Sequence, residues 1–277
     1  MEVVLGLLVA AGFGSGDFLG GLTSRRAATL AVLAVSQLAA FVGAVAVTAA
    51  AGGGVHGAAL AYGAAAGLLN LAAAGCLYRG LAIGQMGQVA PIAAVIGAIL
   101  PVAYGLARGE RPGLPAMVGI GLAVVAAAML ASEREERRGP LFGRALGLSA
   151  AAGVGFGVSL VLFATASRSG GLWPVLSARS TALVAAWVAL FVTGGSSNLK
   201  GVPRVQASLA GLLDVGATTL LLVALRGSLT AVVAPIASLA PGFTAGHARW
   251  YLHERISRVQ MVGVVLALSG LALIAAG

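Results

Sequence analysis

Long apolar segments separated by short polar breaks run through the whole chain. The breaks are rich in Gly, Ser, Pro and Arg, and such clusters favour turns. Each apolar segment has roughly the 20 residues that a helix needs to cross a lipid bilayer. The pattern therefore predicts an all-α, polytopic membrane protein with ten transmembrane helices. These helices are expected at 3–22, 29–50, 57–78, 87–107, 114–131, 143–165, 172–193, 205–225, 231–252 and 258–276.

The composition agrees with helices that face lipid. Hydrophobic residues make up 59% of the chain and charged residues 9%, with a mean hydropathy of +1.01. A water-soluble domain carries about 25% charged residues. A membrane β-barrel would show shorter segments in which apolar and polar residues alternate. Both of these classes are therefore excluded.

The two halves of the chain contain the same motifs at a nearly constant interval. The segment Val-Ala-Pro-Ile at 89–92 returns at 233–236, an interval of 144 residues (233 − 89). Earlier in each half, Gly12 corresponds to Gly155 at an interval of 143 (155 − 12). A long, fixed interval indicates a duplicated unit.

The duplication predicts the domain organisation. Each unit holds five predicted helices, an odd number, so tandem copies enter the membrane from opposite sides. We therefore expect two inverted five-helix repeats, residues 1–132 and 143–277, joined by a charged linker at 133–142. Such halves are typical of transporters whose binding site lies between them.

Arginine and lysine predict the orientation in the membrane. Loops after odd-numbered segments hold eleven of these residues, whereas loops after even-numbered segments hold four. Because such residues are enriched on the cytoplasmic side, both termini are expected outside the cytoplasm and the linker inside it. We therefore attribute the net charge of +9 to the orientation of the protein in the membrane and to contact with anionic lipid, and we expect no nucleic-acid partner. The eleven are Arg25, Arg26, Arg79, Arg134, Arg137, Arg138, Arg144, Lys200, Arg204, Arg255 and Arg258.

Polar groups inside apolar segments are costly, so they are candidates for function. Arg179, in the seventh segment, corresponds to Ser36 in the second, and Gln37 follows Ser36. Asn70 and Asp214 correspond at an interval of 144 (214 − 70). Related polar residues at the contact of two halves would line a central cavity, so we expect these five to bind substrate. The alternatives are snorkelling of Arg179 and interhelical hydrogen bonding.

Two carboxylates are candidates for proton coupling. Asp214 is the preferred acid, because a charged carboxylate is costly inside a membrane. Asp17 lies near the predicted cytoplasmic end of the first segment. For Asp17 the alternative is a helix-end acid paired with Arg25 or Arg26. His247, within the ninth segment, is a further candidate for substrate binding.

Prolines and carboxylates mark the fourth and ninth segments in both halves. Pro91 and Pro235 each remove a backbone N–H, and such paired interruptions indicate hinges for gating, with a packing kink as the alternative. Glu110 and Glu254 end these segments. We interpret both as structural carboxylates beside the N-terminus of the helix that follows each of them.

The sequence contains no pattern typical of an enzyme, a metal site or a cofactor site. Cys76 is the single cysteine, and His56, His247 and His253 are scattered along the chain. The glycines of the first segment lie in an apolar helix, which excludes a phosphate-binding loop. A channel, a receptor and a membrane-embedded enzyme are the alternatives to transport.

Several of these motifs resemble the drug/metabolite transporter superfamily, in its ten-helix EamA-type branch. The likeness rests on Gly109-Glu110-Arg111 and its counterpart His253-Glu254-Arg255, on the repeated Val-Ala-Pro-Ile, and on the closing run at 260–270. It covers essentially the whole chain. The family pattern has Gly where this chain has His253.

The resemblance implies a secondary transporter of the inner membrane that works by alternating access. The implied substrates are small metabolites such as amino acids or drug-like compounds, and export is the expected direction. No cofactor is implied. The expected partners are the small-molecule substrate and the lipid bilayer, and the expected assembly is a monomer or homodimer.

Overall fold

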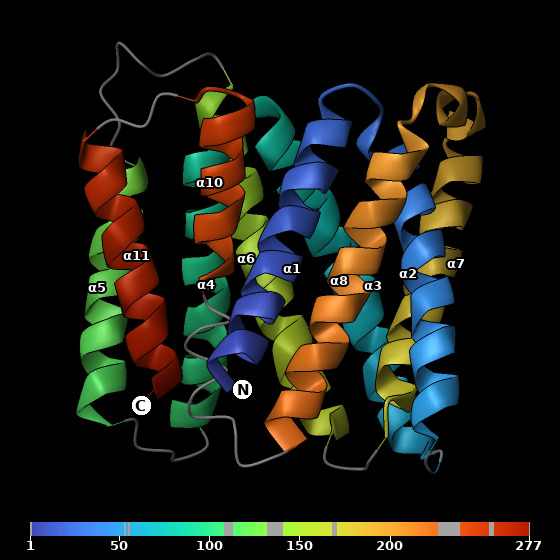
Figure 1. Ribbon diagram of the computed structural model, residues 1–277, viewed down its shortest axis with the longest axis horizontal. Helices are drawn as coiled ribbons and strands as arrows, with labels where there is room; N and C mark the ends of the chain where they lie inside the picture. The colour runs from blue at the N-terminus through green and yellow to red at the C-terminus, as the bar shows by residue number, and fades with distance from the viewer. Residues whose placement is uncertain are drawn as a thin grey trace.

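The chain folds into a bundle of helices that lie side by side (Figure 1). The computed structural model describes residues 2–52, 54, 56–107, 113–131, 141–167, 171–226, 239–254 and 258–276, and every regular element within them is a helix. The α-helices are α1 (Glu2–Ser24), α2 (Thr29–Ala51), α3 (Gly57–Ile83), α4 (Met86–Ala107), α5 (Leu114–Ala131), α6 (Phe142–Ser167), α7 (Trp173–Val192), α8 (Arg204–Arg226), α10 (Ala240–Tyr251) and α11 (Arg258–Ala276).

The observed helices agree with the predicted segments to within a few residues. The largest extension is in α3, which continues past the predicted end at 78 to Ile83. A short 3-10 helix, η2 (Gly195–Gly201), occupies a predicted break. Of the predicted ninth segment, only α10 falls among the described residues, and Pro235 lies outside them.

Among the described helices, six are long and apolar enough to cross a membrane: α1, α2, α3, α6, α7 and α8. The helices α4, α5 and α11 contain shorter apolar stretches, at Met86–Leu100, Leu114–Ala126 and Met261–Ile274. The prediction of an all-helical membrane protein is thereby confirmed at this level.

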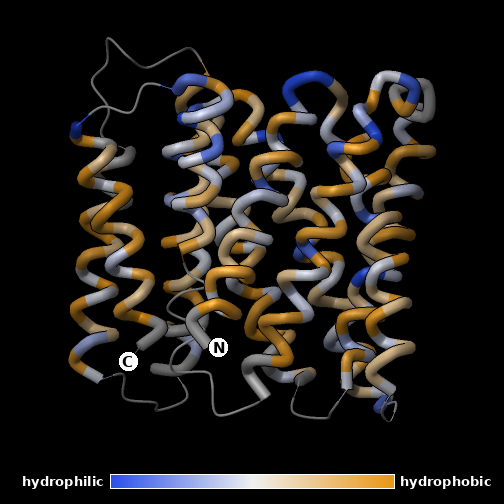
Figure 2. The backbone as a smooth tube through the Cα atoms, viewed as in Figure 1, coloured by the Kyte–Doolittle hydropathy of each residue, from blue (hydrophilic) through white to orange (hydrophobic). Residues whose placement is uncertain are grey.

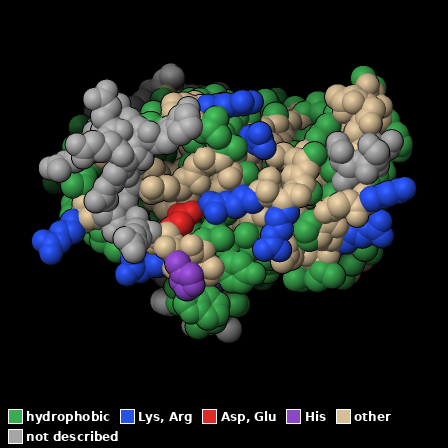
Figure 3. Space-filling model, turned by 90° about the horizontal axis from the view of Figure 1, so that it is seen from above, with side chains coloured by type: hydrophobic (Ala, Val, Ile, Leu, Met, Phe, Trp, Pro, Cys, Tyr) green, Lys and Arg blue, Asp and Glu red, His purple; other side chains and the backbone are tan. Residues whose placement is uncertain are grey.

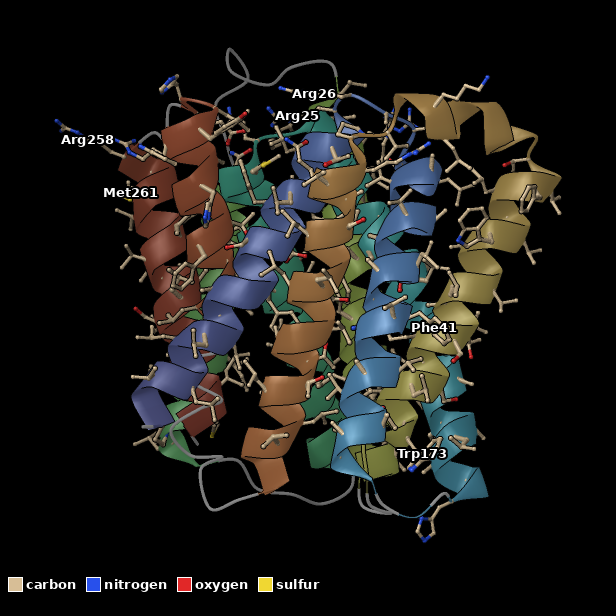
Figure 4. The ribbon with its side chains drawn as sticks, turned by 45° about the vertical axis from the view of Figure 1, so that its right-hand side comes forward. Arg25, Arg26, Phe41, Trp173, Arg258 and Met261 are labelled. Carbon is tan, nitrogen blue, oxygen red and sulfur yellow. The ribbon has the colours of Figure 1, made fainter. Side chains whose placement is uncertain are left out.

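One end of the bundle is more hydrophilic, whereas the helices are apolar along most of their length (Figure 2). Figure 4 places Arg25, Arg26 and Arg258 at this end and Trp173 at the opposite end. Seen from above, the end carries scattered Lys and Arg side chains (Figure 3). We call this surface the basic face. Its exposed cations are Arg25, Arg26, Arg79, Arg144, Lys200, Arg204, Arg249 and Arg258.

Helices that precede the predicted linker pack mainly on helices that follow it. The helix α3 lies against α6 and α7, while α8 lies against α1 and α2. At one side of the bundle α5 and α11 form a pair (Figure 1). The core is therefore an interface between the two halves of the sequence.

Small residues bring these helices into backbone contact. A Cβ atom added at Gly67 in α3 would overlap the carbonyl oxygen of Ala178 in α7. One added at Gly211 in α8 would overlap the carbonyl oxygen of Ser36 in α2. Because lipid gives helices no hydrophobic reason to associate, such close approach supplies much of the attraction in a membrane bundle.

Side-chain hydrogen bonds to backbone carbonyls also join the two halves. In lipid an unsatisfied polar group is expensive, so these bonds fix the helices at defined positions. The donor–acceptor pairs are Ser159–Ala66 (3.1 Å), Ser177–Leu60 (2.8 Å), Trp187–Ala34 (3.1 Å) and Thr244–Gly14 (3.0 Å).

Replacing Gly211 with Ala is expected to destabilise the protein by about 1–3 kcal/mol, the usual cost of forcing extra atoms into a packed contact. Gly216 in the same helix is the matched control, because nothing lies within 4 Å of a Cβ added there. Melting temperatures of the purified variants in detergent measure both effects. Equal melting temperatures for Gly211→Ala and Gly216→Ala would contradict the backbone contact.

Candidate functional site

A buried ion pair lies inside the bundle. The Arg179 side chain of α7 contacts the Asp214 carboxylate of α8, with 2.5 Å between Nη1 and Oδ2. The Arg179 side chain is 3% exposed and that of Asp214 is 27% exposed. Both helices pack against α2, so the long arginine side chain connects two helices that share a neighbour.

Thr218 provides a second contact for the guanidinium, whose buried Nε has no hydrogen-bond partner within the described structure. Arg179 Nη2 donates to Thr218 Oγ1 at 3.1 Å. The hydroxyl in turn donates to the Asp214 carbonyl, one helical turn back, at 2.8 Å. The hydroxyl hydrogen is thus used within α8, and an oxygen lone pair faces Arg179. Asp214 and Thr218 therefore hold the guanidinium in one position.

A second carboxylate, Asp17 of α1, lies within electrostatic range of Asp214. Tyr78 of α3 is within range of both carboxylates and of Arg179. Its ring fills the space beside Gly20, where a Cβ atom would overlap the ring. The group of Asp17, Tyr78, Arg179, Asp214 and Thr218, which we call the interior site, draws on both halves of the chain.

The formal charges of the interior site do not balance. Arg179 neutralises Asp214, whereas Asp17 has no ion-pair or hydrogen-bond partner among the described residues. Asp17 lies seven residues (24 − 17) before the end of α1, about 10 Å along its axis from the basic face. A carboxylate at this depth is costly unless a cation or a proton accompanies it.

The other predicted binding residues are distributed around α2 and α3. Ser36 is buried and donates to the Leu33 carbonyl at 3.1 Å. Gln37 is buried, and its Oε1 has no hydrogen-bond partner within the described structure. Asn70 on α3 is partly buried and forms no hydrogen bond with described residues. These side chains join none of the hydrogen bonds of the interior site.

His247 and Pro91 pack against neighbouring helices. The His247 ring stacks on Phe18, with 5.3 Å between ring centroids, and its Nδ1 lies 2.6 Å from the Phe243 carbonyl oxygen. It therefore lies beside α1, against the residue that follows Asp17 in the sequence. Pro91 is fully buried in the second turn of α4, so its ring faces protein.

One pairing considered from the sequence is wrong. Arg25 forms its ion pair with Glu254, at 2.9 Å, and not with Asp17. Glu254 lies beside a helix N-terminus, but the one that the structure describes there is that of α4, because Glu254 accepts from the backbone N–H groups of Met86 and Gly87. Its true partners come from the other half of the chain, which local sequence reasoning cannot identify. Glu110 lies outside the described residues.

Sequence reasoning also missed Tyr78 and Thr218. Tyr78 stands among apolar residues near the end of α3, where it is typical of a membrane interface. Thr218 lies one helical turn after Asp214, and this i, i+4 spacing is the only local signal of its role.

The interior site suits charge recognition better than metal binding. Among the described residues, no group of three or more His, Cys, Asp or Glu side chains is placed to hold a metal ion. Neither the known protein families nor the curated proteins searched contain a match to this chain.

Removing Asp214 is expected to cost more stability than removing Arg179. In Asp214→Asn the guanidinium stays buried without its ion-pair partner, a loss of about 3 kcal/mol, and arginine cannot release its proton. In Arg179→Gln the remaining carboxylate is partly exposed and can take up a proton. Melting temperatures in detergent, with Thr218→Val as the milder control, give the order. The reverse order would contradict a site organised around Arg179.

Proposed function

We propose that the chain is a secondary transporter built from two inverted five-helix repeats, which together make ten membrane segments. The observation that carries the proposal is the interior site: two partly buried carboxylates and a buried guanidinium among apolar helices from both halves. Ionisable groups inside a membrane bundle are typical of substrate and proton pathways.

Reciprocal packing supports the duplicated architecture. The contacts of α3 with α6 and α7 match those of α8 with α1 and α2. A Cβ at Gly12 would lie 3.0 Å from the Ala217 Cβ, and one at Gly155 would lie 2.9 Å from the Ala73 Cβ. These glycines are related by the interval of 143, and the alanines by 144 (217 − 73). A two-fold axis that relates the two repeats requires such equivalent contacts on either side of it.

The course of the chain supports the inversion. The helix α1 ends beside Arg25 at the basic face, whereas α7 begins with Trp173 at the opposite end (Figure 4). Since α6 immediately precedes α7, it runs away from the basic face, opposite to α1. We place the basic face in the cytoplasm, because Arg and Lys are enriched there.

Alternating access gives the interior site its role. The charge of Asp17 has no partner among the residues that the structure describes. We therefore assign Asp17 as the first proton acceptor, with Asp214 released for the same task when Arg179 changes partner. A proton and a substrate ammonium group compete for these carboxylates. A substrate carboxylate takes the place of Asp214 on Arg179. Small amino-acid-like metabolites meet both requirements, and the resemblance to the drug/metabolite transporters favours export of such compounds.

A carrier differs from a channel in showing counterflow, the exchange of labelled for unlabelled substrate without net transport. A thermal-shift screen of the purified protein against a metabolite library supplies the substrate, since ligand bound only by the folded state raises the melting temperature. Counterflow of that ligand in proteoliposomes is the expected result. A ligand that raises the melting temperature but shows no counterflow would rule out a carrier.

Asp17→Asn is expected to retain counterflow and to lose the acceleration of transport by a pH gradient, by at least about tenfold. The substitution keeps the size of the side chain and removes the proton acceptor, while Arg179 and Asp214 remain paired. Arg26→Gln is the control, because Arg26 is exposed at the basic face. Normal proton-driven transport by Asp17→Asn would refute its assignment.

A further inference from the structure

A network of charged hydrogen bonds joins three helix ends at the basic face. Arg25, just after α1, donates to Glu254 at 2.9 Å. The same guanidinium donates to the carbonyls of Leu81, at 3.3 Å, and Gly84, at 3.3 Å, where α3 ends. Arg25 therefore holds the end of α1 against the turn between α3 and α4, as well as against the segment after α10.

Glu254 connects this network to α4. Its Oε1 accepts from the Met86 N–H at 3.3 Å, and its Oε2 accepts from the Gly87 N–H at 3.4 Å. These N–H groups belong to the first turn of α4, where no carbonyl of the helix can satisfy them and where the helix dipole favours a negative charge. The Glu254 carboxylate thus binds both Arg25 and the N-terminus of α4, which belong to the other half of the chain.

The turn after α10 places Glu254 in this position. His253 has a left-handed backbone, with φ of 53°, and the Glu254 N–H returns to the Ala248 carbonyl at 3.4 Å. A left-handed residue reverses the chain direction at a helix end. The same conformation explains why a glycine suits this position in the family that the motif resembles.

An apolar layer lies beneath the network. It combines side chains from α1, α3, α4, α6 and α10, all of them buried, and it extends from Leu81, whose carbonyl Arg25 contacts, down to Phe18, the neighbour of Asp17. The members are Phe18, Leu22, Leu77, Leu81, Met86, Val89, Ala90, Ala93, Ala145, Ala152 and Ala248. Water and polar solutes cannot cross such a layer while its helices remain in contact.

A cavity of about 490 Å³ lies against the same network, between α4 and α6. Arg25 and Glu254 form part of its wall, together with Gln85, Gln88 and Ser149. The cavity is large enough for a small metabolite. The apolar layer contributes Val89 and Ala145 to the cavity wall and separates this cavity, which we call the vestibule, from the carboxylates of the interior site.

We propose that Arg25 and Glu254 form a latch, which keeps the basic face closed in this state and opens when α10 moves away from α1 and α4. The proposal rests on the transport function proposed above. Both side chains are partly exposed, 28% for Arg25 and 14% for Glu254, so water can replace the bonds as the latch opens. The vestibule is the place where substrate waits on the basic side.

The distance between spin labels at Ala28→Cys and Arg249→Cys, in a Cys76→Ala background in nanodiscs, measures the opening. Both positions are exposed at the basic face, and neither belongs to the latch. Arg25→Gln is expected to add a longer-distance population and to raise the ratio of open to closed states about tenfold, the scale of one hydrogen bond to a charged group. Glu254→Gln is expected to raise it further, because α4 also loses its anion.

A charge exchange and two control variants separate a latch from a simple ion pair. The exchange Arg25→Glu with Glu254→Arg should leave the open population high, since arginine cannot accept from the N–H groups of α4. Arg26→Gln and Arg25→Lys are the controls and should remain closed, and gel filtration confirms that each variant is folded. Identical distance distributions in all variants, or restoration by the charge exchange, would overturn the proposal. Because the distances are measured without substrate, this result is independent of the counterflow assay.

Discussion

The permanent charge of Arg179 inside an apolar bundle is the constraint on which the arrangement of the interior depends. Burial of a guanidinium in a membrane protein is tolerated only when counter-charge and hydrogen-bond acceptors surround it. Asp214 and Thr218 supply these groups from α8, and both α7 and α8 rest on α2. The backbone contacts at Gly67 and Gly211 bring α3 onto α7 and α8 onto α2. Close helix packing and charge compensation therefore depend on each other, because wider spacing between the helices would separate the guanidinium from its counter-charge.

Every acidic side chain that the structure describes has a place in this scheme. Asp214 neutralises Arg179, and Glu254 joins Arg25 to the first turn of α4. Asp17 lies between these two pairs without a partner of its own among the described residues. Charges are thus arranged at two levels, one at the basic face and one in the interior, with the apolar layer between them. Such an arrangement is what a carrier needs, because each level can change partners while the other remains closed.

The sequence predicts the helices well and their partners poorly. Apolar length and turn residues locate α1 through α8 to within a few residues, because a helix needs roughly 20 apolar residues to cross lipid. The interval between Asn70 and Asp214 directs attention to the correct helix, α8, and Arg179 is recognisable as a charge inside an apolar segment. The pairing of Arg25 with Glu254 joins residues 229 positions apart and depends on how α10 meets α4, which no local pattern contains. Tyr78 is missed for the same reason, since its role depends on Gly20 of another helix.

The proposed transport mechanism depends most on the two halves crossing the membrane in opposite directions, with the basic face on one side. Single cysteines at Arg26, His56 and Arg258, in a Cys76→Ala background, test this directly with a membrane-impermeant maleimide. All three positions are exposed, with Arg26 and Arg258 at the basic face and His56 at the start of α3, at the other end. The account predicts that His56→Cys is labelled in intact cells, whereas Arg26→Cys and Arg258→Cys are labelled only after permeabilisation. Labelling of His56→Cys and Arg26→Cys from the same side would contradict it.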